Sequence, residues 1–242
     1  MYHPFTIADT LKAAWIIFKR NFITIIVYSV VAFFVLLILG MILAVLFTAD
    51  NFFVELIVWA ITLFVQSYTT LGLYKLIFTL IDSEFYEFKI TQILPKFTMT
   101  ISFAVVQLLF ATLLESYKFI LDHILPEGVI MDIAILLGSF GVLYIVLRGM
   151  YSPSFIVDDA SGPIESIRQS FQLTKGYFMS TLATLGIIIL LIAVPAVLSK
   201  YILWAPLFII FSYPFVNIFL MEAYRKLVYS HQDVDDLDTE TV

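Results

Sequence analysis

A few charged and polar side chains interrupt the long apolar runs of this 242-residue chain, and they are the first candidates for chemistry. They are Arg148, Glu222, Lys75 and Gln66. Apolar runs of this length are typical of membrane-spanning helices, where a charge costs about 2.5–3.5 kcal/mol and usually finds a partner. Three arrangements stay open: Arg148 extends to the lipid headgroups, Arg148 pairs with Glu222, or Lys75 takes Glu222 instead.

Gln66 belongs to a polar patch in one of these runs. The patch has four members: Gln66, Ser67, Thr69 and Thr70. The residues 77 positions later, 143–144 and 146–147, are mainly apolar, which argues against a symmetric aqueous channel. We therefore expect the patch to form hydrogen bonds between helices, worth about 0.6 kcal/mol each.

A second set of charges lies in segment 158–176. Glu165 and Arg168 are one helical turn apart, and an exposed pair at that spacing contributes only about 0.2–0.5 kcal/mol. Alternatively, Arg168 docks against Asp158 or Asp159 and fixes its helix to the end of the preceding span. Both interpretations remain open from the sequence.

The residue types needed for metal binding or catalysis do not cluster along the chain. His3, His123 and His231 are far apart, and the chain has no cysteine. Phosphate-binding loops, nucleophile elbows and zinc-protease motifs are absent from the sequence. Basic residues form no nucleic-acid footprint. We expect no metal site, no cofactor and no nucleic-acid partner.

Composition indicates an all-α polytopic membrane protein. Hydrophobic residues make up 62% of the chain and charged residues 13%, with a mean hydropathy of +1.02. Recurring apolar runs of 18 or more residues predict helices that cross the bilayer, because lipid cannot satisfy backbone polar groups. Six such runs can be drawn: 22–47, 53–78, 99–121, 130–152, 177–198 and 203–227.

The basic residues predict how these spans are oriented. In the six-span arrangement 11 of the 13 Lys and Arg residues fall on one side, and only Lys118 and Lys200 fall on the other. The positive-inside rule then places both termini in the cytoplasm. The acidic segment 231–242 is expected to be a disordered tail.

Three segments predict amphipathic helices at the cytoplasmic surface of the membrane: 5–20, a stretch from about residue 83, and 162–175. Thr6 and Asp9 fit a capping box at the start of the first. Pro163 suits the first turn of the third, and Gly176 suits a break after it.

The spacing of these segments predicts an internal repeat. The sequences at 71–74, 148–151 and 226–229 end in tyrosine and are 77 and 78 residues apart. We therefore expect a single membrane domain, 1–230, built from units 5–80, 83–158 and 161–230. Each unit would be an interfacial helix followed by a transmembrane hairpin, all three with the same orientation.

Residues 162–176, Gly-Pro-Ile-Glu-Ser-Ile-Arg-Gln-Ser-Phe-Gln-Leu-Thr-Lys-Gly, follow Phe-Ile-Val-Asp-Asp at 155–159. This pattern resembles the YciC-like superfamily of bacterial integral membrane proteins, which includes the membrane domain of some glycerophosphodiester phosphodiesterases. Segments 15–22 and 72–97 look similar as well, and Ser166 departs from the usual alanine. The catalytic barrel of the phosphodiesterases has no counterpart here, so the resemblance implies no hydrolase activity. The matching motif positions are Asp158, Gly162, Pro163, Glu165, Arg168, Ser170 and Gly176.

Together these features favour a non-enzymatic protein of envelope organisation, with no catalytic residue. It would bind membrane lipids, other membrane proteins or further copies of itself through a basic, aromatic cytoplasmic belt. The alternative is a transporter or channel for a small or lipidic substrate, with an intramembrane enzyme as a third hypothesis.

Overall fold

The structure, a computed structural model, describes the backbone of residues 6–47, 51–82, 90–123, 128–202 and 207–239. Within these ranges the chain is helical and contains no strand. The helices are α1 (Ile7–Arg20), α2 (Phe22–Leu46), α3 (Phe52–Asp82), α4 (Ile90–Ile93), α5 (Phe97–His123), α6 (Val129–Gly149), α7 (Ser152–Asp158), α8 (Pro163–Leu173), α9 (Phe178–Leu198) and α10 (Leu207–Thr239).

Five helical segments among the described residues are long and apolar enough to cross a membrane. They are Phe22–Leu46, Phe52–Asp82, Thr91–Leu121, Val129–Asp158 and Phe178–Leu198. The all-helical class is confirmed for the described residues, and these segments are consistent with a membrane protein. The sixth predicted run, 203–227, begins at residues 203–206, which lie outside the described residues. The rest of it falls in α10, which is not among the five and in which Asn217 and Glu222 interrupt the apolar residues.

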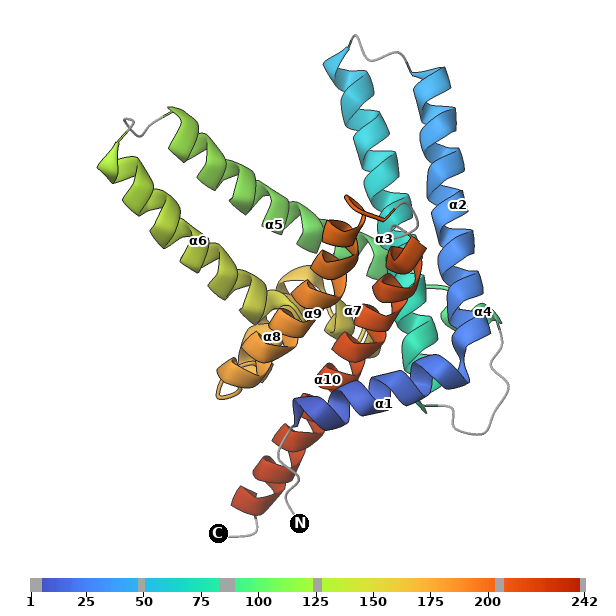
Figure 1. Cartoon of the computed structure of the whole chain (residues 1–242), viewed down its shortest axis with the longest axis vertical. Coiled ribbons are helices and arrows are strands. Elements are labelled where there is room, and N and C mark those ends of the chain that lie inside the picture. The colour runs from blue at the N-terminus through green and yellow to red at the C-terminus, as the bar shows by residue number, and fades with distance from the viewer. Residues whose placement is uncertain (1–5, 48–50, 83–89, 124–127, 203–206, 240–242) are drawn as a thin grey trace.

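Two long hairpins dominate the shape of the molecule (Figure 1). Hairpin α2–α3 and hairpin α5–α6 extend toward the same side and diverge, while α9 and α10 lie between their bases. Helices α1 and α8 and both chain ends lie on the opposite side. We refer to that side as the base and to the hairpin loops as the tips.

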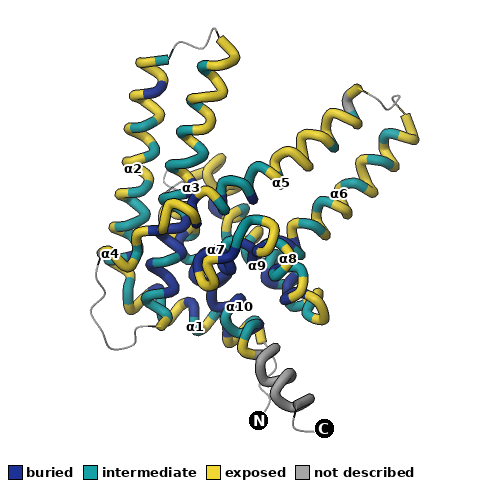
Figure 2. Tube along the Cα trace, turned by 180° about the vertical axis from the view of Figure 1, so that it is seen from behind, coloured by how far each residue is buried: buried dark blue, intermediate teal, exposed yellow. Residues whose placement is uncertain are grey.

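The buried core lies at the base (Figure 2). The side chains of Leu71, Tyr151, Phe219 and Tyr224 are at most 1% exposed, and they come from α3, the α6–α7 junction and α10. By contrast, few residues in the most apolar part of each span are buried. In α2, 6% of the residues in that part are buried, and in Val129–Asp158 none of them is buried. The chain therefore packs against itself at one end of its spans and leaves the other end uncovered.

Helix α1 lies across α10 as part of this core (Figure 1). The Thr6 hydroxyl accepts a hydrogen bond from the Asp9 amide at 3.3 Å, which confirms the Thr6 half of the predicted capping box. The Asp9 carboxylate accepts from the Thr6 hydroxyl and not from the backbone amide of a described residue. Phe18 is buried, with its ring centroid 5.6 Å from that of Phe215. Ala14 is buried on the same face, whereas both lysines of the helix are exposed, so α1 is amphipathic as expected.

The second predicted surface helix is described only in part. Residues 83–89 lie outside the described residues, and the remainder is the single turn α4, separated from α5 by Pro95. The third is α8, which starts with Pro163 in its first turn as predicted. After α8 the chain turns at Gly176, whose φ of +89° favours glycine, before α9 begins.

The fourth predicted span, 130–152, corresponds to α6, and the chain turns at Met150 and Tyr151 into a separate short helix, α7, that was not predicted. Pro153 lies in the first turn of α7, where its missing amide removes no helical hydrogen bond. Helix α7 is almost entirely buried: Ile156 is fully enclosed. This short helix supplies the centre of the base.

The threefold repeat is not confirmed. Tyr74 and Tyr151 are buried at the ends of the first two hairpins, but Tyr229, their expected counterpart, is 56% exposed. Tyr224 is the α10 tyrosine that lies beside Tyr151, with 6.3 Å between the ring centroids. At the C-terminus, the helical backbone of α10 continues to Thr239, into the segment expected to be a disordered tail, because extending an existing helix costs little.

Candidate functional site

The strongest ionic contact among the described residues lies where α3, α7 and α10 meet. The Nη2 atom of Arg225 is 2.6 Å from Oδ2 of Asp82 and 3.6 Å from Oδ1 of Asp158. Asp82 ends α3 and Asp158 ends α7, so one guanidinium joins the ends of two hairpins to α10. With Tyr224, these residues form what we term the exit cluster.

Aromatic rings shield the exit cluster on one side. The Tyr224 hydroxyl donates a hydrogen bond to Oδ2 of Asp158 at 3.0 Å, and its ring meets those of Phe78 and Phe155 edge-on. The Arg225 guanidinium lies 4.9 Å from the centre of the Phe78 ring. The Arg225 side chain is 17% exposed and that of Asp82 is 55% exposed. This ion pair is therefore intermediate in solvent exposure: it is less shielded than a fully buried pair and more shielded than a surface pair.

Acidic residues are in excess around the exit cluster. Burial raises the pKa of Asp159, the Asp158 and Glu165 carboxylates raise it further, and Arg225 opposes these effects. Glu222 is buried on α10, one turn before Arg225. Even so, no group of three or more His, Cys, Asp or Glu residues within the described ranges could hold a metal ion. The cluster can act as an electrostatic clamp.

The predicted pair of Arg148 with Glu222 does not form. The Arg148 guanidinium lies 5.4 Å from the Phe171 ring centre and 6.0 Å from that of Tyr144. Its Nε atom is buried and has no hydrogen-bond partner among the described residues. Arg148 is therefore held between aromatic rings, which attract a cation over their faces.

Lys75 does not take Glu222 either. Its Nζ atom donates to the backbone oxygen of Leu94 at 2.9 Å, just after α4 ends. The ammonium group thus supplies a hydrogen-bond donor to a backbone carbonyl at the C-terminal end of α4. It ties the connection before α5 to α3. In the part of the chain that the structure describes, Glu222 has no ion-pair partner within 4.0 Å.

Helix α8 docks through Ser170 instead of Arg168. The Ser170 hydroxyl donates to the backbone oxygen of Arg148 at 2.6 Å and accepts from the Tyr151 amide at 3.2 Å. Arg168 and Glu165 lie on the exposed face of α8, and Arg168 forms no ion pair with a described residue. The interpretation that docks Arg168 on Asp158 or Asp159 is wrong, because helical spacing turns Ser170 toward the core and Arg168 away from it.

The polar patch of α3 connects helices, as predicted, although Gln66 itself is exposed. The Ser67 hydroxyl donates to Oε1 of Gln107 on α5 at 3.1 Å. The backbone oxygen of Thr69 accepts from the Tyr28 hydroxyl on α2 at 2.9 Å. The patch therefore links both hairpins, which is the job that hydrogen-bonding groups usually perform between membrane helices.

Asp82, Tyr224 and Arg225 are the site residues that sequence reasoning missed. Asp82 and Asp158 each follow a hairpin exit, 76 residues apart, on the side of the chain that is otherwise rich in basic residues. Acidic residues on a basic side are a usable signal, because each is a candidate partner for a nearby Lys or Arg. That signal does not identify which base is the partner.

Comparison with protein-family models, with curated proteins and with solved structures finds no match to this chain.

Proposed function

We propose that this chain is a six-span protein of the bacterial inner membrane that catalyses no reaction and holds lipids or partner membrane proteins between its hairpins. In this proposal α10 is the sixth span and both termini are cytoplasmic, so the base faces the cytosol. The chain would belong to the YciC-like superfamily that its 158–176 motif resembles.

The observation that carries this proposal is the divergence of hairpins α2–α3 and α5–α6 (Figure 1). They leave apolar side chains such as Phe33 and Leu137 more than half exposed along the spans. Water does not tolerate apolar surfaces of this extent, whereas acyl chains or other transmembrane helices cover them at no cost. A gap between spans that the chain does not fill itself must be filled by one of the two.

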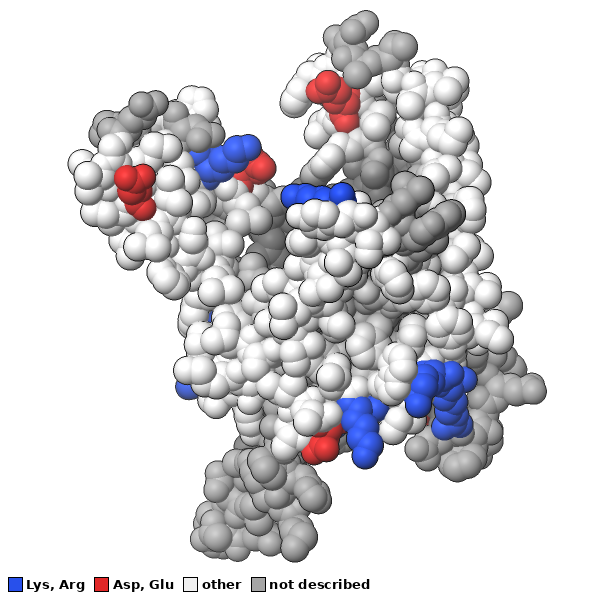
Figure 3. All heavy atoms as spheres, in the orientation of Figure 1, with Lys and Arg blue, Asp and Glu red and all other residues white. Residues whose placement is uncertain are grey.

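The distribution of charge supports the proposed orientation (Figure 3). Basic side chains gather over α1 at the base beside an acidic one, and both acidic and basic side chains lie toward the hairpin tips. Because the chain has no cysteine, single cysteines at Lys12, Lys175 and Lys200 can be labelled selectively. An impermeant thiol reagent applied from outside should reach only position 200. Labelling of position 12 or 175 would contradict the orientation.

Native mass spectrometry of the purified chain tests the function itself. The protein would be released from membranes in mild detergent and examined for bound lipid and for additional subunits. We expect retained lipid, a partner or an oligomer. A bare monomer under gentle conditions would refute the proposal.

A second candidate function, transport of a small or lipidic substrate, is favoured by an open groove of about 790 Å³ between α3 and α5. At the base, however, Tyr151, Phe219 and Tyr224 are packed without exposure to solvent. A route across the membrane would have to separate these side chains. Reconstitution into liposomes distinguishes the two functions, since a carrier would speed the exchange of lipid or solute between the two sides.

A further inference from the structure

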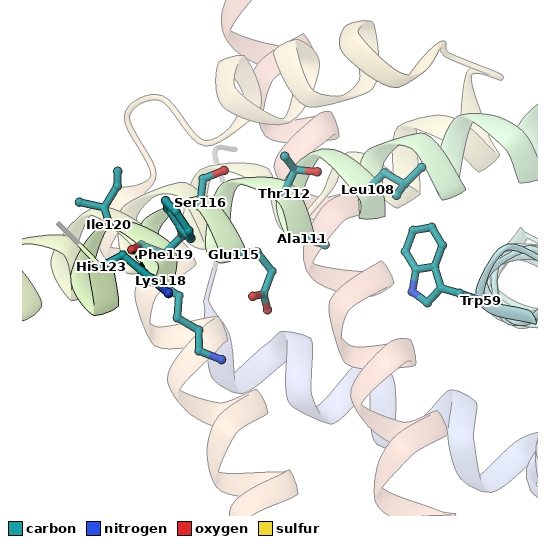
Figure 4. Close-up of a pocket in the computed structure, with 10 residues that line it drawn as sticks. All are labelled: Trp59, Leu108, Ala111, Thr112, Glu115, Ser116, Lys118, Phe119, Ile120 and His123. Atoms are coloured by element: carbon teal, nitrogen blue, oxygen red, sulfur yellow. Dashed lines mark hydrogen bonds between the residues drawn. The ribbon is translucent and has the colours of Figure 1, made fainter. Parts of the chain in front are cut away.

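The groove between α3 and α5 has two unlike walls (Figure 4). Trp59 of α3 forms one wall, and residues of α5 from Leu108 to His123 form the other. The volume of about 790 Å³ lies within the roughly 300–1,000 Å³ that small-molecule sites occupy. The groove widens toward the hairpin tips, which our proposed orientation places at the outer leaflet.

Polar and apolar residues of α5 both line this groove. The polar ones are Thr112, Glu115, Ser116, Lys118 and His123, and of these Glu115 and Lys118 extend to the same side. Leu109, Leu113 and Leu114 are also exposed but do not line the groove, so they face the surrounding lipid. A helix that turns its charges into a gap and its leucines outward is arranged for polar contents in that gap, because charges facing hydrocarbon are costly.

The two charges in the groove have no partners within the described ranges. Neither Glu115 nor Lys118 forms an ion pair there, although they are three residues apart on α5. Figure 4 shows both side chains extending from α5 to the same side, into the space that Trp59 faces. A ligand with one negative and one positive group would neutralise both.

Apolar residues line the groove along its length. Leu108 and Ala111 precede the charged residues on α5, so they lie closer to the base, and Trp59 faces them from α3. Phe119 and Ile120 follow the charged residues toward the tip, so the groove offers an apolar wall with two charges set into it.

We propose that this groove binds a phospholipid whose headgroup carries both a phosphate and a primary ammonium, the chemistry of phosphatidylethanolamine. Lys118 and His123 hold the phosphate, Glu115 holds the ammonium, and an acyl chain lies along Trp59 and Leu108. This assignment rests on the proposed lipid-holding function and names its ligand. A partner helix with an apolar surface would leave both charges unpaired, and an anionic headgroup without an amine would leave Glu115 unpaired.

The test uses the full-length chain in nanodiscs that contain equal amounts of phosphatidylethanolamine and phosphatidylglycerol. Native mass spectrometry after release gives the ratio of the two lipids retained. We expect the unaltered chain to retain the ethanolamine lipid preferentially. Glu115→Gln should lower that preference by about tenfold, the loss expected for one charge-assisted contact to the ammonium. Lys118→Met removes a contact to the phosphate that both lipids carry, so it should lower the total lipid retained and leave the preference largely unchanged.

Two matched controls remove charges near the tips that lie outside the groove. Asp132→Asn and Lys200→Met alter exposed residues that do not line it, and the preference should not change. The double variant Glu115→Lys, Lys118→Glu keeps one charge of each sign in the groove. It should recover most of the preference lost in Glu115→Gln, which a nonspecific loss of structure would not.

The outcomes separate this inference from the function on which it rests. If the unaltered chain retains no lipid, both fail. If lipid is retained with no headgroup preference, or if the groove variants match their controls, the groove assignment alone is overturned. If Trp59→Ala dissociates an oligomer and leaves the retained lipid unchanged, a second copy of the chain occupies the groove and the assignment is likewise overturned.

Discussion

The base and the tips of this molecule are built from the same kinds of residue but are stabilised differently. At the base, phenylalanine, tyrosine and leucine side chains from α3, α7 and α10 bury one another, and Phe219 is fully enclosed. Toward the tips the same residue types face outward, and Phe33 is 60% exposed. The polar contacts follow the same division, since the exit cluster lies at the base while Glu115 and Lys118 near the tips have no described ion-pair partner.

The difference shows that apolarity alone does not make membrane helices associate. Lipid tails are as apolar as leucine, so separated hairpins lose little when lipid covers them. Helices associate where hydrogen bonds, ion pairs and close packing add to the contact. In this chain those additions are concentrated at the base, and the hairpins diverge beyond it.

The largest expected difference concerns one substitution made in both regions. Phe219→Ala at the base should lower the free energy of unfolding by about 3–5 kcal/mol, because the cavity left in a closed core cannot collapse fully. Phe33→Ala on α2 should change it by less than about 1 kcal/mol, because lipid fills the vacated space. Reversible unfolding in mixed micelles measures both. Equal losses would show that the outer spans are packed as tightly as the base.

The next effect concerns the clamp that makes the base cohesive. Arg225→Met leaves Asp82 and Asp158 without their shared cation, and we expect a loss of about 2–3 kcal/mol in the free energy of unfolding. That is less than for a fully buried pair because the Asp82 side chain is half-exposed. Arg168→Met, on the exposed face of α8, should stay within about 0.5 kcal/mol of the unaltered chain. Comparable losses in the two variants would show that the exit cluster contributes no more to the free energy of unfolding than an exposed arginine does.

The features predictable from the sequence were those decided by neighbours along the chain. The predicted spans 22–47 and 177–198 differ by one residue from α2, Phe22–Leu46, and α9, Phe178–Leu198, since apolar length alone sets them. The Thr6 cap and the Gly176 turn are likewise local. Composition and short-range spacing contain this information in full.

The contacts between hairpins were not predictable in the same way. Arg225 and Asp82 are 143 residues apart, and several other acids were equally plausible partners by charge. Only the bend at Tyr151, which turns α7 inward, brings Asp158 to Arg225. The choice of Ser170 over Arg168 for docking α8 likewise depends on which face meets the core. These contacts depend on how the helices pack in three dimensions. Because the helices are all similarly apolar, their sequences do not indicate which faces meet.

A smaller effect tests how hairpin α5–α6 stays closed away from the base. A Cβ added at Gly138 would lie 2.2 Å from the Tyr117 hydroxyl, and the displaced ring would lose its 3.0 Å hydrogen bond to the Ala134 oxygen. Gly141→Ala is the matched control, because nothing lies within 4 Å of its added Cβ. Both variants gain helix propensity, so we expect Gly138→Ala to be less stable than Gly141→Ala by about 1–2 kcal/mol in thermal unfolding. Equal stability would mean that lipid, and not this contact, holds the hairpin together.

The smallest effect concerns the crowding of carboxylates at the base. Burial and the adjacent Asp158 raise the pKa of Asp159 in the folded chain, so near pH 4 the folded state binds more protons than the unfolded state. The stability that this group contributes is therefore lost as the pH rises through its folded pKa, and at neutral pH the ionised carboxylate destabilises the folded chain. Asp159→Asn removes that destabilising charge, so it should raise the unfolding temperature at about pH 7. The gain should shrink as the pH falls below about 4. If Asp159→Asn instead lowers the unfolding temperature at neutral pH, the attraction between Asp159 and Arg225 outweighs the repulsion from Asp158, and the ionised Asp159 carboxylate stabilises the base.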